Sequence, residues 1–374
     1  MHDFHMDDVS ATLQRIVSAF RTVLYQEDDT FMQNMKTNNL QSDDISRYRY
    51  WEWTQGVGLF GLWKMFEATR EETYLDMLVR FYDERIAYGL PGKNVNTTAP
   101  MLALSFVYEH TGFERYEGVI REWAEYMMNG LPRTEEGGFQ HITSDTENRG
   151  ELWDDTLYMV VLFLANAGRI MNEPDWQQEA EYQFLLHIKY LADRANGLWY
   201  HGWTFEGRHN FVGAHWGRGN AWVTAAIPEF FRIASPLPAV RRFLEEAYRA
   251  QVKELEKLQD ANGMWHTLLD DAESYPEASA TCGIAYGMMT GVDMGLVDGK
   301  IRDCAMRAVA PILNLVDQDG VMQQVSYGTP MGRESLEFYK QIKITPMPYG
   351  QAMAMLFLIE VLKTQHLSPD AKAI

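Results

Sequence analysis

The chain has 374 residues, and 46% of them are hydrophobic, which is enough for a large buried core and excludes wholesale disorder. Its formal charge of −19, from 33 basic and 52 acidic side chains, argues against nucleic acid and anionic membrane surfaces as partners. The sequence holds no apolar run long enough for a membrane span, and the acidic start Met1–Asp8 lacks the pattern of a signal peptide. We therefore expect a cytoplasmic protein with one domain, residues 1–374.

Six apolar segments recur along the chain, each hydrophobic on nearly every face and rich in Gly and Ala. Such segments are typical of helices that are buried on all sides and packed closely together. The six predicted inner helices are Thr54–Ala68, Pro100–Glu109, Asp154–Ile170, Gly219–Ile233, Ser279–Gly291 and Tyr349–Leu362.

Amphipathic segments alternate with these apolar ones, and each carries charged residues opposite an apolar stripe, as expected for outer helices. Strand signals are weak and confined to the connecting loops. The six predicted outer helices are Val9–Tyr25, Glu72–Tyr88, Glu114–Met128, Trp176–Ala192, Val240–Leu258 and Ile301–Val316.

A short pattern of Gly, an apolar residue and a nearby His or Gln recurs ahead of the inner helices, at intervals of about 60 residues. Stacked units place these polar loops at one end of the molecule, where function is expected. The alternation predicts an all-α protein with an (α/α)6 barrel. The alternative is an open helical solenoid that only binds a partner, but the loops are unusually rich in Trp, His and Arg. The pattern begins at Gly138, Gly197 and Gly263 and, more faintly, at Gly320.

Asp154 and Asp155 stand side by side at the start of the most apolar segment. One Asp is explained as a helix N-cap whose negative charge interacts favourably with the positive end of the helix dipole. Neighbouring residues of a helix point about 100° apart, so one of the two should face the mouth of the barrel, and spacing alone leaves open which. A helix N-terminus stabilises the carboxylate, so an acid here needs burial or a second carboxylate to raise its pKa.

A second polar group lies at the start of the fourth inner helix, where glycines flank Arg218 between Trp216 and Trp222. The planar guanidinium suits a carboxylate, and the indole rings suit sugar faces, so the group suits a sugar acid. Packing of the Trp side chains at a helix entrance is the alternative.

Two histidines, His141 and His201, occupy the same position in successive units, which favours a functional role for each. Neither belongs to a cluster with metal-ligand spacing, and we expect no metal and no organic cofactor. Asn96 lies in a polar loop before the second inner helix, which is also explained as a cap followed by Pro near the helix start. The two cysteines, Cys282 and Cys304, are expected to be buried free thiols.

The chain resembles the unsaturated rhamnogalacturonyl hydrolases, glycoside hydrolase family 105, which are related to the unsaturated glucuronyl hydrolases. The resemblance spans nearly the whole length, and its most specific parts are a Trp-x-Asp-x-Leu-x-Met and a Trp-Gly-Arg signature in combination. It rests on Trp51-Glu52-Trp53 with Gly56, Asn94–Pro100, Gly138–His141, Trp153–Met159, His201-Gly202-Trp203, Trp216-Gly217-Arg218, Glu277-Ala278-Ser279 and Gly350-Gln351-Ala352.

The resemblance implies that Asp155 is the catalytic acid and that Asp154 is a capping or supporting residue. Members of the family act on oligosaccharides with a Δ4,5-unsaturated uronic acid at the nonreducing end, and they hydrate its enol-ether double bond. Many members carry an Asp where this chain has Asn96, which hydrogen-bonds but does not repel an anion. How Asp155 keeps its proton is therefore open: burial must do more, or Asp154 must contribute.

The remaining site residues follow from the same resemblance. Arg218 and His201 are expected to hold the uronate, with His141 beside the acid, and the stacking surfaces are expected to be Trp53, Trp216 and Trp222. The predicted partner is a small unsaturated oligosaccharide, and the predicted state is a monomer or weak homodimer. The alternatives are a glucuronyl hydrolase on glycosaminoglycan fragments, another (α/α)6 enzyme such as a sugar epimerase or a mannosidase, and a binding scaffold without activity.

Overall fold

The structure, a computed structural model, describes residues 4–367. The ends of the predicted domain 1–374 lie outside the described residues, and so does the start of the segment Met1–Asp8. The prediction that all 374 residues form one domain stays a prediction.

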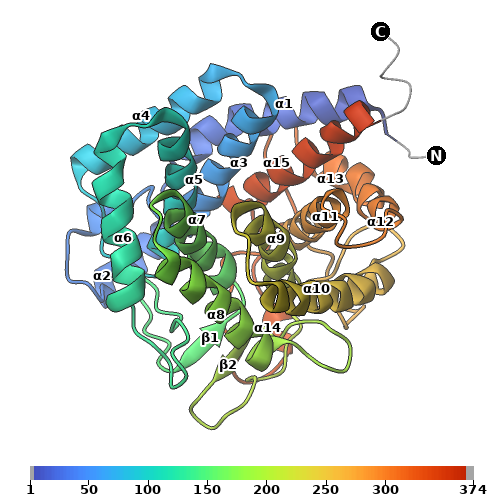
Figure 1. Ribbon diagram of the computed structural model, residues 1–374. Coiled ribbons are helices and arrows are strands. Elements are labelled where there is room, and N and C mark those ends of the chain that lie inside the picture. The colour runs from blue at the N-terminus through green and yellow to red at the C-terminus, as the bar shows by residue number, and fades with distance from the viewer. Residues whose placement is uncertain (1–3, 368–374) are drawn as a thin grey trace.

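Six helices form a closed ring at the centre of the molecule (Figure 1). Each contacts the next along the chain, from α3 through α5, α7, α9 and α11 to α15, and α15 contacts α3 again. Because the ring closes on itself, the predicted (α/α)6 barrel is confirmed. The bounds of the inner helices are α3 Trp53–Thr69, α5 Val95–Thr111, α7 Leu162–Ile170, α9 Gly217–Ile233, α11 Ala278–Asp293 and α15 Pro348–Lys363.

An outer layer of helices surrounds the ring (Figure 1), and every amphipathic segment predicted from the sequence contributes to it. The last of these segments is divided at Ala308, because Pro311 has no N–H to donate to the carbonyl group of Arg307. The outer helices are α1 Met6–Val23, α4 Glu72–Tyr88, α6 Glu117–Asn129, α8 Pro174–Leu191, α10 Pro238–Leu258, α12 Ile301–Arg307 and α13 Val309–Leu315.

Glycines allow the inner helices to approach one another closely. A Cβ atom at Gly56 of α3 would lie 2.6 Å from the backbone of Ala99 in α5. A Cβ atom at Gly287 of α11 would lie 2.3 Å from the carbonyl oxygen of Thr224 in α9. Real Cβ atoms do not come this close to backbone atoms, so the Gly content of the apolar segments follows from the tight ring.

The recurring Gly pattern of the sequence is a turn that follows an outer helix. Gly197, Gly263 and Gly320 have positive φ angles of 86°, 87° and 81°, a region that glycine enters without steric cost. The same backbone hydrogen bond closes each turn, between Asp193 and Leu198, Asp260 and Met264, and Asp317 and Val321.

Shorter elements lie in the loops, and the strand signals are confined there as predicted. Two of the predicted inner helices begin elsewhere than expected: α5 starts at Val95, five residues before Pro100, and the third inner helix is helical only from Leu157, after both aspartates. The short elements are α2 Asp29–Asn38, η1 Ile45–Tyr48, η2 Glu114–Tyr116, β1 Glu151–Trp153, η3 Leu157–Val161, β2 Gly202–Thr204, α14 Glu337–Lys340 and η4 Thr364–Leu367.

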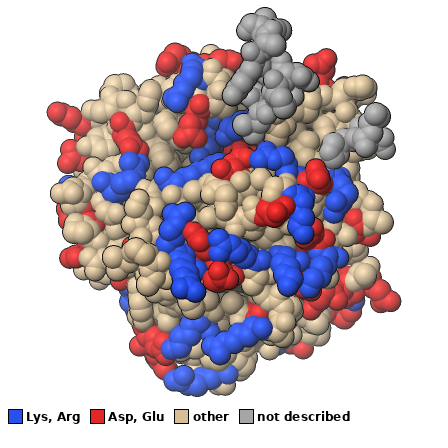
Figure 2. Space-filling model, turned by 45° about the vertical axis from the view of Figure 1, so that its right-hand side comes forward, with Lys and Arg blue, Asp and Glu red and all other residues tan. Residues whose placement is uncertain are grey.

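The surface of the molecule is mixed in charge. Figure 2 shows Lys and Arg side chains interspersed with Asp and Glu on one face, so this face is not uniformly negative despite the net charge of −19. Among residues 4–367, no helix combines the length and the apolar character that a membrane crossing requires.

Candidate active site

A cavity of about 370 Å³ opens at the end of the barrel where the inner helices begin. Its wall is completed by the segment around α2 and by residues 327–331 and 333, close to the C-terminal inner helix. The positive ends of the helix dipoles point toward this cavity, which favours an anionic ligand. Residues at or near the starts of α3, α5, η3, α9 and α15 line the cavity: Trp53, Asn96, Asp155, Arg218 and Met347.

A short strand pair positions the start of the third inner helix. Trp153 at the end of β1 pairs with Gly202 of β2, and the N–H of Asp154 then donates to the carbonyl group of His201 at 3.1 Å. The chain enters α7 through the π-helical turn η3, a wide turn that is frequent at functional sites. Both aspartates therefore lie in the link between a strand and a helix.

Asp155 presents its carboxyl group to the cavity. Its side chain is 16% exposed, and its Oδ1 lies 3.2 Å from Nδ1 of His141. Burial raises the pKa of Asp155 to about 7, against the opposing effects of Arg218 and of the backbone N–H groups of Asp155 and Thr156. An acid with this pKa is about half protonated at neutral pH, so it can both donate and accept a proton there.

Asp154 is buried behind Asp155, on the side of α9. A Cβ atom at Gly219 would lie 2.0 Å from its Oδ2, so any larger residue there would displace the Asp154 carboxyl group. Neither carboxyl oxygen of Asp154 has a hydrogen-bond partner among residues 4–367, so the expected capping bond is not seen. Burial, together with the neighbouring Asp155, raises the pKa of Asp154 well above its usual range. A neutral carboxyl group follows, because an unpaired buried charge is costly.

His141 lines the cavity, as predicted, beside Asp155. Its ring stacks on Trp153 with the ring centroids 4.1 Å apart, and its Nδ1 lies 2.9 Å from Oγ1 of Thr156. Burial lowers the pKa of His141 to about 3, so the imidazole is neutral at physiological pH. The contact between His141 and Asp155 is therefore not an ion pair.

His201 lies behind the cavity wall and is not among the described residues that line the cavity. Its ring contacts Trp153 and Trp216, with centroid distances of 5.1 and 4.2 Å. Its Nδ1 lies 2.7 Å from the hydroxyl group of Tyr339, and burial lowers its pKa well below the usual range. The sequence predicted direct contact between His201 and the ligand, whereas the structure places His201 where it supports two Trp side chains.

Arg218 lines the cavity, but its fork is already engaged within the protein. Nη1 donates to Oγ of Ser326 at 2.6 Å, and Nη2 donates to Oγ1 of Thr329 at 2.9 Å and to the carbonyl oxygen of Tyr327 at 3.2 Å. Nε has no partner in the described part of the chain, and Glu277 lies 3.6 Å from Nη1. An anion in the cavity therefore meets the charge of Arg218 rather than a free pair of N–H donors.

The three tryptophans predicted as stacking surfaces, Trp53, Trp216 and Trp222, all line the cavity. Trp53 stacks on Tyr349 with ring centroids 4.5 Å apart, and the guanidinium of Arg218 lies 4.6 Å from the ring centroid of Trp216. Such flat faces suit the apolar face of a sugar ring.

Glu52 is a cavity residue to which the sequence analysis gave no role. It comes directly before α3, is only 5% exposed and faces the cavity with Asn96. Burial raises the pKa of Glu52 to about 8, although hydrogen bonds from Ser144 and Asn96 oppose this shift. The available signal was a carboxyl group at the mouth of an otherwise apolar inner helix.

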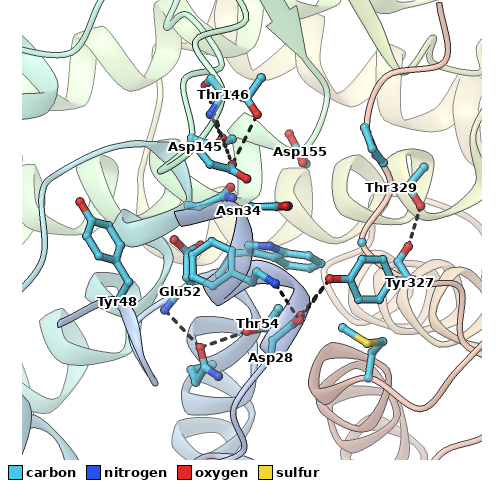
Figure 3. Close-up of a pocket in the computed structure, with 18 of the residues that line it drawn as sticks. Asp28, Asn34, Tyr48, Glu52, Thr54, Asp145, Thr146, Asp155, Tyr327 and Thr329 are labelled. Atoms are coloured by element: carbon cyan, nitrogen blue, oxygen red, sulfur yellow. Dashed lines mark hydrogen bonds between the residues drawn. The ribbon is translucent and has the colours of Figure 1, made fainter. Parts of the chain in front are cut away.

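Part of the cavity wall joins a segment from the N-terminal region to one from the C-terminal region of the chain (Figure 3). The hydroxyl group of Tyr327 lies 3.1 Å from Oδ2 of Asp28, and both residues line the cavity. No local pattern marks this pair, because 299 positions separate the two residues in the sequence.

Residues 4–367 hold no group of three or more His, Cys, Asp or Glu side chains arranged to bind a metal ion. Cys282 and Cys304 are free and buried, as predicted.

Residues 23–365 match the family described as Glycosyl Hydrolase Family 88. The unsaturated rhamnogalacturonyl hydrolase YesR of Bacillus subtilis (strain 168) is 33% identical over 319 residues, which cover 84% of this chain and 90% of that protein. A crystal structure from Salmonella enterica serovar Paratyphi A, described as a possible member of the GH105 family, is 42% identical with a TM-score of 0.89 and covers 97% of this chain and 96% of its own. A second such structure, from Klebsiella pneumoniae, is 40% identical with a TM-score of 0.89 and covers 98% of this chain and 95% of its own.

These similarities confirm the family resemblance that the sequence motifs indicated, and they exclude the interpretation as a binding scaffold without activity. The chain belongs to Glycosyl Hydrolase Family 88 and is a glycoside hydrolase.

Proposed function

We propose that this enzyme removes a Δ4,5-unsaturated uronic acid from the nonreducing end of pectin (rhamnogalacturonan) oligosaccharides that a lyase has released. The observation that carries the proposal is the Asp155 carboxyl group, which faces a cavity walled by Trp residues with its pKa raised to about 7. The name of the B. subtilis relative supports the same substrate class.

A single acid is enough for the proposed reaction. Asp155 donates its proton to C4 of the double bond, and positive charge develops at C5 and the ring oxygen. Water then adds its oxygen to C5 and returns a proton to the Asp155 carboxylate. The resulting hemiketal opens at the bond between C5 and the ring oxygen, which forms the C5 ketone and leaves a hemiacetal at C1. The hemiacetal then breaks its bond to the glycosidic oxygen, which takes up a proton, and the saturated sugar and a keto-uronate are released. This differs from ordinary glycoside hydrolysis, in which two carboxyl groups flank the bond that breaks.

Asp155 is a better base for the second step than His141. The pKa of Asp155 is raised to about 7, whereas that of the adjacent imidazole is lowered to about 3, so the proton of water passes more favourably to the carboxylate. Burial supports the protonated state of Asp155 without a carboxylate at position 96, where this chain has Asn96. Asp154 contributes little charge, because its own pKa is raised further.

The cavity suits the anionic part of such a substrate. The starts of the inner helices direct their positive dipole ends toward it, and Arg218 adds a positive charge at the wall. Trp53, Trp216 and Trp222 supply flat surfaces for the sugar rings. No step requires a metal ion or an organic cofactor.

We also propose that the enzyme works in the cytoplasm as a monomer or weak homodimer, with small oligosaccharides rather than nucleic acid or membranes as its partners. The two free buried thiols support a reducing compartment. Size-exclusion chromatography with light scattering at micromolar concentration tests the oligomeric state.

The experiment that tests the proposed function follows the ultraviolet absorbance of the conjugated double bond. The purified enzyme is incubated with an unsaturated rhamnogalacturonan disaccharide and, in parallel, with an unsaturated glycosaminoglycan disaccharide. The expected result is loss of absorbance with the first substrate. Loss of absorbance with the second substrate alone would show that the substrate is a glycosaminoglycan fragment instead. If folded enzyme causes no loss of absorbance with either substrate, the proposed reaction is refuted.

A further inference from the structure

Glu52 is a buried carboxyl group in the cavity wall that has no task in the reaction proposed above. It lies directly before the first inner helix, whereas Asp155 lies before the third, and both line the same cavity (Figure 3). Only 5% of Glu52 is exposed, so almost all of its contact with solvent passes through this cavity.

A chain of hydrogen bonds fixes one oxygen of this carboxyl group. Nδ2 of Asn94 donates to Oγ of Ser144 at 3.0 Å, and Oγ of Ser144 donates to Oε1 of Glu52. Oε1 is therefore an acceptor in a buried network, and this network stays intact when the carboxyl group carries its proton on Oε2. A neutral carboxylic acid held in this way has one O–H to donate.

The ionisable groups nearest to Glu52 on neighbouring elements do not favour its carboxylate. Asp145, from the loop after the second unit, raises the pKa of Glu52, and burial raises it more, to about 8. Tyr48 of η1 has a pKa raised far above neutral and stays uncharged. Arg49, the cation on this side of the cavity, is paired with Glu27 at 3.2 Å.

The other charged or ionisable groups of the cavity include the catalytic acid, its neutral neighbour His141, and Arg218. Arg333 and Asp28 also line the cavity, where Arg333 pairs with Glu151 at 2.9 Å and Asp28 accepts from the hydroxyl group of Tyr327 at 3.1 Å. Glu277 and the loop at residues 326–329 already hold the guanidinium of Arg218. Asn96, which hydrogen-bonds Glu52, carries no charge. Glu52 is thus the group on its own wall whose charge changes just above neutral pH.

We propose that Glu52 is a further substrate-binding residue, which donates a hydrogen bond to the anionic sugar as a neutral acid and repels that sugar as a carboxylate. The inference rests on the proposed function for the identity of the anion. It accounts for a buried carboxyl group in a cavity that must admit an anion, because only the neutral form avoids repulsion between like charges. Affinity for the substrate then falls as pH rises through the titration of Glu52.

The test measures binding in a variant that does not turn over. The affinity of Asp155→Asn for the unsaturated rhamnogalacturonan disaccharide is measured by calorimetry at pH 6 and pH 9. Because Asn does not ionise, position 155 does not contribute to any difference between the two pH values. If only neutral Glu52 binds, the affinity falls by about tenfold between these pH values. The double variant Asp155→Asn/Glu52→Gln keeps an N–H donor in place and loses the titration, so its affinity is expected to change less than about twofold.

Two further measurements keep the inference testable if Glu52→Gln does not fold. In Asp155→Asn/Ser144→Ala the carboxylate loses a donor, so the pH at which affinity is lost moves up by about one unit. In Asp155→Asn without sugar, ¹³C spectra of Glu-labelled protein are expected to show a carboxyl group that titrates near pH 8 and depends on Glu52.

The outcomes separate this inference from the proposed function. Equal loss of affinity at pH 9 with and without Glu52→Gln, an unshifted midpoint in Ser144→Ala, or no carboxyl group that titrates near pH 8 would each overturn the role of Glu52 alone. Failure of Asp155→Asn to bind the disaccharide even at pH 6 would instead count against the proposed substrate.

Discussion

The two ends of this barrel bury carboxyl groups in opposite electrostatic surroundings. At the cavity end, burial raises the pKa of Asp155 to about 7. At the other end of the inner helices, Glu229 is more deeply buried, with 1% of its side chain exposed against 16% for Asp155. Its pKa is nevertheless lowered to about 2, because Lys64 and Arg232 lie 3.2 and 2.7 Å from its oxygens. Burial alone therefore does not decide the protonation state of a carboxyl group. Cations in direct contact with the carboxyl group, as at Glu229, reverse the effect of burial.

The comparison also separates function from stability. Glu229 is held as a carboxylate by charge pairs that tie α3 to α9, so it stabilises the ring. The pKa values of Asp155 and its neighbour Asp154 are raised on folding, so both must take up a proton when the chain folds at neutral pH, where they are ionised in the unfolded chain. This proton uptake lowers the free energy of unfolding at neutral pH. The cavity end is therefore expected to be the less stable one.

The largest expected effect is on turnover at the cavity end. Asp155→Asn keeps the shape of the side chain but removes the proton that we propose is donated to C4, so kcat should fall by about 10²- to 10⁴-fold. The measurement is loss of ultraviolet absorbance from the unsaturated disaccharide, with circular dichroism to show an intact fold. Turnover near the wild-type rate would remove Asp155 from the mechanism.

The opposite end should respond in stability instead. Lys64→Met leaves the buried Glu229 short of one cation and is expected to lower the free energy of unfolding by about 3–5 kcal/mol, as measured in urea, with little change in kcat. Lys257→Met is the matched control, because Lys257 pairs with Glu254 at the surface, with side chains 58% and 20% exposed, and the expected loss is below about 1 kcal/mol. Equal losses in the two variants would contradict the importance of burial for this pair.

The pH dependence of stability should differ in sign between the ends. Because the pKa of Asp155 is raised on folding, its cost appears as pH rises from about 4, where the unfolded carboxyl group ionises, to about 7. Asp155→Asn should therefore be more stable than wild type, by up to about 4 kcal/mol at pH 7 and by little at pH 4. For Glu229 the pKa is lowered, so its contribution is present above about pH 4.5 and lost as pH falls toward 2. A gap that widened toward acid in Asp155→Asn would show that this assignment is reversed.

The smallest expected effect concerns sugar stacking. Trp53 stacks on Tyr349 and also lines the cavity. Trp53→Leu should therefore raise KM by about 2- to 12-fold, which corresponds to about 0.5–1.5 kcal/mol, with kcat nearly unchanged. Phe113→Leu, at a 38% exposed position outside the residues that line the cavity, is the control. A larger change in kcat than in KM would assign Trp53 to the chemical step.

Most of the fold could be predicted, because the apolar and amphipathic segments alternate clearly and each inner helix lies within a few residues of its predicted place. The errors occur where a helix start depends on tertiary contacts. The third inner helix was expected from Asp154, but the pairing of Trp153 with Gly202 and the π-helical turn delay it to Leu157. The break at Ala308 could have been read from Pro311.

The site was predictable where one residue carries its own signal and was not where partners are distant in sequence. Asp155, His141 and the three tryptophans line the cavity as expected. His201 does not line the cavity, because its ring packs against Trp153 and Trp216, which separate it from the cavity. The guanidinium of Arg218 is hydrogen-bonded to residues more than 100 positions later in the chain. Glu52 could not be recognised from the sequence, because its raised pKa depends on burial and on Ser144 and Asp145, which only the fold brings close to it.

The pH dependence of kcat/KM for the unsaturated disaccharide, measured with wild-type enzyme between pH 5 and pH 8, tests most directly whether Asp155 holds the proton that the reaction uses. With a pKa of about 7 in the free enzyme, loss of the Asp155 proton should lower kcat/KM by about tenfold between pH 6 and pH 8, and the titration of Glu52 near pH 8 should add about twofold to this fall. A profile that is flat or rises over this range would contradict an acid that burial keeps protonated.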